Sequence, residues 1–241
     1  IQDAVFVSAA NTGHFPALWQ GGGHINIDTG IFKKDPLLFR NFIVDLLNHN
    51  ELFMGIFNYD RRNAKPHQIG YVETFDEVVR GMLVEADTQI AAGRSDFESL
   101  ASIFHYALKS LGGAFNLAKR EEGRIEIRGF RPQASMDVFI RQIELLERRL
   151  QFLERLNKPI PYAPRVPFHF SFEDWVNPPV EPQAALRAFY EYVQESGLPW
   201  KDHRDYLWPQ WMNPSGELGK FEESDWFKSR ESAGCRSLLA R

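Results

Sequence analysis

The chain contains very little cysteine and no long apolar run. Its single cysteine, Cys235, excludes an internal disulfide and any zinc site built from several thiolates. A chain with only one cysteine is typical of a reducing compartment, so we expect a cytoplasmic protein. No apolar run approaches the roughly 20 residues of a membrane helix, and the first residues lack the features of a signal peptide. We therefore expect no membrane partner.

An excess of positive charge is missing as well. The 28 Lys and Arg residues face 32 Asp and Glu residues, which gives a net charge of -4. Proteins that bind nucleic acid usually carry a basic excess or stripe, so we expect no nucleic-acid partner. The 241 residues, 44% of them hydrophobic and 25% charged, are typical of one large globular domain with or without an appendage.

Apolar spacing predicts the elements of the first half. Alternation predicts strands over 3–8 and 24–28, joined by a long loop with a glycine triplet. A helix is predicted over 36–48 with Asp35 as its N-cap, and residues 57–63 are predicted to form a loop. Two capping boxes predict helices that end near Gly93 and Gly112: Thr74 with Glu77, and Ser95 with Glu98.

The second half is predicted to hold a hairpin, a long helix and a tail. Strands over 114–119 and 124–130 flank a glycine turn, and a helix of about six turns follows over 135–156. Its apolar stripe is at positions 136, 139, 143, 146, 150 and 153. A short helix is predicted over 182–196. Proline and tryptophan content then divides the chain into a main domain, a Pro-rich linker and a loop-rich, Trp-rich C-terminal extension: residues 1–157, 158–182 and 183–241.

Two of the predicted strands have a dense polar face. Alternation puts isoleucines on one face, which we expect to be buried, and polar side chains on the other. The polar sets are His24, Asn26 and Asp28 in the first strand, and Arg124, Glu126 and Arg128 in the second. One interpretation is a half-exposed antiparallel sheet whose polar side faces water. The other is a cleft in which an imidazole and a carboxylate hold a divalent cation and guanidinium groups hold phosphate or carboxylate.

Short motifs in these strands resemble those of the glutamine synthetase superfamily. Residues 21–27, Gly-Gly-Gly-His-Ile-Asn-Ile, resemble its Gly-x-Gly-x-His-x-His strand. Residues 124–128, Arg-Ile-Glu-Ile-Arg, followed by Phe-Arg-Pro, resemble its Arg-x-Glu-x-Arg strand. The motif order, the helical spacing between the motifs and the long helix after the second most resemble the divergent amidoligase, or carboxylate-amine ligase, branch. The resemblance covers roughly residues 3–157.

The resemblance implies a fold and an activity. The fold would be α+β, with a curved antiparallel sheet of the glutamine synthetase-like type covered by helices on one face. The activity would be ATP-dependent amide formation through an acyl phosphate, with Mg or Mn, acting on small-molecule or peptide carboxylates and amines. By position, His24 and Glu126 match metal ligands, Glu126 and Arg128 match catalytic residues, and Asn26, Asp28 and Arg124 match nucleotide-binding residues.

The resemblance also bears on whether the site is complete. The family's remaining metal carboxylates come from an earlier strand, and no Glu-x-Glu pattern precedes His24. Since hard cations usually take about six ligands, His24 and Glu126 alone would leave the ion under-ligated. We therefore expect either that upstream residues are missing, so that the chain alone is inactive, or that the site is degenerate. The rival hypothesis is a noncatalytic binding or structural module.

The remaining reactive side chains are expected to play ordinary roles. Residues 60–62 are predicted to form a solvated loop, with closure over substrate as the alternative. Cys235, beside Arg236, lacks a partner base for a nucleophilic role. The Trp-rich extension could cover its own domain or a neighbouring subunit, so both a monomer and a homo-oligomer are compatible with the sequence. The other six histidines lack metal spacing and are expected at the surface or hydrogen-bonded: His14, His49, His67, His105, His169 and His203.

Overall fold

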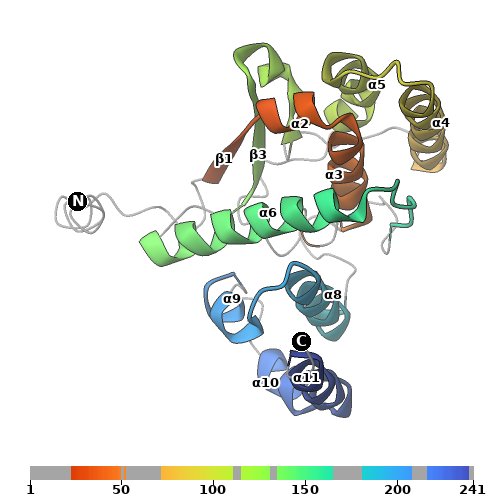
Figure 1. Ribbon diagram of the computed structural model, residues 1–241. Helices are drawn as coiled ribbons and strands as arrows, with labels where there is room; N and C mark the ends of the chain where they lie inside the picture. Colours follow the sequence, from red (N-terminus) through yellow and green to blue (C-terminus); the bar gives the residue numbers. More distant parts are fainter. Residues whose placement is uncertain are drawn as a thin grey trace, which may run out of the picture.

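The computed structural model is an α+β arrangement, mostly helical with a small antiparallel sheet (Figure 1). It describes residues 23–49, 52, 72–110, 115–130, 135–164, 181–207 and 216–238. The long helix α6 lies between the sheet and the C-terminal helices (Figure 1). In chain order the elements are β1 (Gly23–Asp28), α2 (Gly30–Lys34), α3 (Pro36–Asn48), α4 (Val72–Ala91), α5 (Phe97–Ser110), β2 (Phe115–Asn116), a 3-10 helix (Leu117–Glu122), β3 (Arg124–Phe130), α6 (Met136–Leu156), α8 (Pro182–Glu195), α9 (Trp200–Leu207), α10 (Glu217–Glu223) and α11 (Asp225–Leu238).

The described strands form one sheet in the order β1-β3-β2. β1 pairs antiparallel with β3, and the register places Asn26 opposite Glu126 and Asp28 opposite Arg124. The predicted burial of the isoleucines is confirmed, because Ile25, Ile27, Ile125 and Ile127 all belong to the core. The two strands therefore carry an apolar and a polar face, as their alternation predicts.

The predicted strand over 114–119 is wrong beyond Asn116. Only Phe115 and Asn116 pair with β3, and residues 117–122 form a 3-10 helix whose first residue, Leu117, is buried. Gly123 then turns the chain into β3 with a φ of 77°, a conformation that glycine adopts without steric cost. Burial of Leu117 thus outweighs the alternating pattern in this segment.

Local capping residues set several helix starts. Asp35 caps α3 by accepting a hydrogen bond from the Leu38 amide, and Ser135 caps α6 through the Val138 amide, so both predicted starts are confirmed. The two predicted capping boxes are wrong. α4 begins at Val72, which puts Thr74 inside the helix, and Asp96 rather than Ser95 accepts from the first turn of α5, from the Ser99 amide at 2.7 Å.

The buried face of α6 differs from its predicted apolar stripe. Leu146 and Leu153 are buried, but Ile143 is 39% exposed, and the polar residues Gln142 and Arg149 are buried instead. The spacing of apolar residues alone does not identify the buried face of α6. An arginine can also be buried in the core when a carboxylate on another element pairs with it. That carboxylate belongs to α3, as the site geometry below shows.

The C-terminal extension is helical rather than loop-rich, which corrects the prediction. Beyond the confirmed helix α8, the helices α9, α10 and α11 fill most of its described part, and α11 includes Cys235. Tyr190 of α8 makes edge-on ring contacts with Trp200, Phe221, Trp226 and Phe227. These aromatic residues therefore pack among the helices of the extension itself.

The first part of the Pro-rich linker is tied to α3. The Asn41 side chain donates to the Lys158 carbonyl at 2.9 Å and accepts from the Ile160 amide at 3.0 Å. About two turns later, Asn48 donates to the Pro161 carbonyl at 2.9 Å and accepts from the Ala163 amide at 2.7 Å. Two asparagines thus pair the extended chain with the helix. Several sequence predictions lie outside the described residues: strand 3–8, loop 57–63 with residues 60–62, and His14, His67 and His169.

Candidate functional site

The polar face of β1 and β3 carries an arginine-centred cluster. Arg124 of β3 donates from Nη2 and Nε to Glu122 Oε2 at 2.7 and 3.2 Å. Its Nη1 also lies 3.4 Å from Asn26 Oδ1 on β1. Asn26 is exposed, and the Arg124 and Glu122 side chains are 39% and 50% exposed, so the cluster is open to solvent. We call Asn26, Glu122 and Arg124 the Arg124 cluster.

Glu126 lies next to this cluster but is almost entirely buried. It belongs to the middle strand, opposite Asn26 of β1 and Asn116 of β2, and only 5% of it is exposed. It takes part in interactions within the chain. A carboxylate so far from water needs polar or charged partners to offset its desolvation.

The structure brings the two motif strands together. The prediction that His24 and Glu126 lie on neighbouring strands is confirmed by the β1–β3 pairing, with a register shift between Gly23 and Ile25. The side chains of His24 and Arg128 lie outside the described part of the molecule, so their convergence on one cleft stays a prediction. The Asp28 carboxylate accepts from the Gly30 amide at 2.5 Å, a local contact at the start of α2.

The described side chains do not complete a metal site. Over the described ranges, no group of three His, Cys, Asp or Glu side chains is placed to hold a metal ion. Of the two predicted ligands, only the Glu126 side chain is described, and a hard cation needs several oxygen ligands.

Within the described ranges, no helix combines the length and the apolar character that crossing a lipid bilayer would require.

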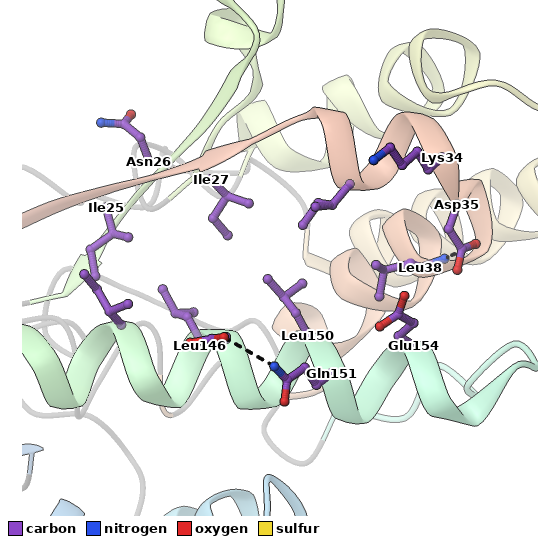
Figure 2. Close-up of a pocket in the computed structure, with 13 residues that line it drawn as sticks. Ile25, Asn26, Ile27, Lys34, Asp35, Leu38, Leu146, Leu150, Gln151 and Glu154 are labelled. Atoms are coloured by element: carbon purple, nitrogen blue, oxygen red, sulfur yellow. Dashed lines mark hydrogen bonds between the residues drawn. The ribbon is translucent and has the colours of Figure 1, made fainter.

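A cavity of about 560 Å³ lies on the opposite, apolar face of β1. Figure 2 shows Ile25 and Ile27 directed into it and Asn26 pointing away from it. Asn26 borders both the cavity and the Arg124 cluster, but its side chain is on the cluster's side of the strand, so β1 lies between the two. Sequence patterns do not reveal this cavity, because its walls come from four elements: β1, α2, α3 and α6.

Sequence reasoning also missed a buried polar cluster at the junction of α3, α6 and α8. Arg149 of α6 donates from Nε and Nη2 to the two Asp45 oxygens at 2.9 and 2.5 Å, and both side chains are at most 3% exposed. The Tyr192 hydroxyl of α8 lies 3.3 Å from Asp45, and Arg149 Nη1 donates to Glu195 at 2.9 Å. The signal that could have revealed it is Arg149 midway between Leu145 and Leu153, four residues from each.

Several side chains of this cluster have shifted pKa values. Burial alone would raise the pKa of the Asp45 carboxyl, but Arg149 and His49 hold it at about 2. Burial lowers the pKa of His49, yet the hydrogen bond and the charge of Asp45, 3.2 Å from Nδ1, raise it above its ordinary value. Burial and Asp45 raise the pKa of the Tyr192 hydroxyl. The expected hydrogen-bonded role of the histidines is confirmed for His49. His203 meets it at Nδ1, 3.0 Å from the Pro199 carbonyl, whereas its buried Nε2 has no hydrogen-bond partner among the described residues.

Comparison of the chain with family models, with curated proteins and with solved structures finds no match.

Proposed function

We propose that this chain carries the sheet of an ATP-dependent carboxylate-amine ligase of the glutamine synthetase-like type. The observation that supports the proposal is the register of β1 and β3, which pairs Asn26 with Glu126 and Asp28 with Arg124. The two motifs that resemble the superfamily are far apart in the sequence, since Asn26 and Arg124 are 98 positions apart, yet they are adjacent in the sheet. A common site for the two motifs requires this adjacency.

The Arg124 cluster gives the proposal its chemistry. The Arg124 guanidinium already donates two hydrogen bonds to one carboxylate oxygen of Glu122, from Nη2 and Nε. A phosphate or a substrate carboxylate presents the same kind of oxygen, and an arginine fork binds either of them. Because Glu122 is half exposed and adjoins a turn, an incoming anion can take its place on Arg124. In the proposed enzyme, Arg124 orients the anionic groups between which phosphate is transferred, and such positioning supplies most of the rate in phosphoryl transfer.

The metal of the proposed reaction does not fit the described residues by themselves. Glu126 is one carboxylate in a buried position, and it belongs to no group of three described His, Cys, Asp or Glu side chains that could hold a metal ion. We therefore assign no step to a metal. The resemblance alone assigns roles to the predicted site residues: Asn26, Asp28 and Arg124 to nucleotide, Arg128 and Glu126 to the reacting groups, and His24 with Glu126 to the cation.

The first test is nucleotide binding by the full chain. Calorimetric titration with ATP and Mg²⁺ should show binding, and Arg124→Lys should weaken it because lysine keeps the charge but loses the planar fork. The matched control is Arg80→Lys, which changes an exposed arginine paired with Asp76 on α4 and should leave binding unchanged. Equal binding by both variants would remove Arg124 from the site. Absence of nucleotide binding, both by this chain and by a longer protein that supplies an upstream acidic strand, would refute the proposal.

A second candidate is a noncatalytic binding module. The burial of Glu126 and the lack of a grouped metal site among the described residues favour it. Phosphate release with ATP and a panel of amino acids and amines separates the two hypotheses. Release that depends on both an acid and an amine, from this chain or from a longer protein that supplies an upstream acidic strand, supports the ligase. Nucleotide binding without release from either protein supports the module.

A further inference from the structure

The cavity on the apolar face of β1 has walls that the fold itself fixes. Leu38 of α3 and Leu146 of α6 line it, and both belong to the core, with 5% of each exposed. The walls therefore need no rearrangement to form the cavity. Its volume of about 560 Å³ lies within the range of sites that hold small organic molecules.

The mouth of the cavity carries apolar side chains in contact with solvent. Ile31 of α2 and Ile143 of α6 are 38% and 39% exposed, and both line it. Isoleucines that border a concave apolar surface mark a place where a ligand removes that surface from water. An apolar body is therefore one half of the ligand's chemistry.

Acidic groups surround the apolar middle. The lining includes three carboxylates, on Asp35, Glu147 and Glu154, against the single ammonium group of Lys34. Figure 2 shows Lys34, Asp35 and Glu154 together at one end of the cavity. Asp35 accepts from the Leu38 amide and Glu147 from Gln151 at 3.3 Å, while Glu154 has no ion-pair partner among the described residues. At this end two carboxylates face one ammonium group, so its net charge is negative and a cationic head complements it.

We propose that the cavity binds an amphiphilic cation, with its apolar chain between β1 and α6 and its ammonium or guanidinium head beside Asp35 and Glu154. In a two-fold symmetric contact, a second copy of this chain is a poor occupant, because the same acidic edge would face itself. The proposal is independent of the proposed ligase activity, since β1 separates this cavity from the Arg124 cluster.

Three probes with one apolar chain and different heads test the charge preference. n-Octylamine, n-octanol and octanoate are titrated into the full chain by calorimetry, below micelle-forming concentrations. Octylamine should bind most tightly and octanoate most weakly. Glu154→Gln should weaken octylamine binding roughly two- to fivefold, the range of an exposed ion pair, and leave octanol binding unchanged.

A variant that blocks the cavity tests where the probe binds. Ile143→Trp adds bulk at the mouth and should abolish octylamine binding. Val84→Trp is the matched control, because Val84 is 68% exposed on α4 and does not line the cavity. Unfolding temperatures of both variants without ligand show whether each one folds, and if Ile143→Trp is unfolded, Ile143→Lys takes its place and should repel the same probe. Equal binding of amine and octanoate, or unchanged binding in the blocked variant, would overturn the proposal. Binding of a synthetic Leu/Lys helix in the absence of octylamine binding would also overturn it, in favour of a basic protein partner.

Discussion

Arg149 and Arg124 each pair with a carboxylate at ordinary hydrogen-bond distance, yet the two pairs have different roles. Arg149 meets Asp45 where both side chains are at most 3% exposed, whereas Arg124 and Glu122 are 39% and 50% exposed. The buried pair joins α3 to α6, 104 residues apart, and the exposed pair joins residues only two apart. Contact distance does not distinguish them, but access to water does.

The difference indicates which arginine stabilises the fold and which is available for binding. A buried charge that loses its partner costs several kcal/mol, because water cannot replace the partner. An exposed pair contributes little, because water solvates both groups as they separate. We therefore expect substitutions at Asp45 and Arg149 to affect stability, and substitutions at Arg124 to affect ligand binding.

The largest expected effect is that of Asp45→Ala. It leaves the Arg149 guanidinium buried without its main partner and should lower the free energy of unfolding by about 3–5 kcal/mol. Urea unfolding followed by circular dichroism measures this loss. The matched control, Glu122→Ala at the exposed pair, should cost about 0–1 kcal/mol. Similar costs for the two variants would mean that the buried cluster does not hold the helices together.

Acid should destabilise the protein through the same carboxylate. The pKa of Asp45 is about 2 in the folded state against 3.8 ordinarily, so its contribution is complete above pH 3.8 and is lost as the pH falls toward 2. The shift corresponds to about 2–3 kcal/mol. Unfolding free energies of the wild type and of Asp45→Asn across this window measure it. The difference between them should shrink as the pH falls, and a constant difference would contradict the assignment.

His49 gives a smaller effect of opposite sign. Its pKa is raised in the folded state, so its contribution is complete below the ordinary value of 6.5 and is lost as the pH rises through the folded-state value. His49→Gln should remove this decline in stability above pH 6.5. Thermal unfolding of both proteins from pH 6 to pH 9 tests the expectation. If the wild type shows the same slope as the variant, Asp45 does not bias the protonation of His49.

Local sequence predicted the starts of α3 and α6 because Asp35 and Ser135 each accept a hydrogen bond from an amide in the first turn of the helix. The pairing of the motif strands followed from alternation and motif order. The buried face of α6 was not predictable in the same way, because Arg149 enters the core only through Asp45, a residue distant in sequence. The Asp28 carboxylate likewise has a local contact, with the Gly30 amide, that the resemblance does not reveal.

The smallest effect on stability is expected at the Arg124 cluster. This effect tests most directly whether the exposed Arg124–Glu122 pair differs from the buried Arg149–Asp45 pair. Arg124→Gln removes the hydrogen bonds to Glu122, but both groups regain water, so the free energy of unfolding should change by no more than about 0.5 kcal/mol. Raising the salt concentration should reduce even this difference, because the pair is exposed and screened. Urea unfolding of the wild type and the variant, in low salt and in 1 M NaCl, measures the difference in unfolding free energy and its dependence on salt. In 1 M NaCl the Debye screening length is about 3 Å. A loss of several kcal/mol would place Arg124 with Arg149 as a structural residue. An unchanged stability would leave its guanidinium free to exchange Glu122 for a ligand's oxygen, because the fold would not depend on the contact it gives up.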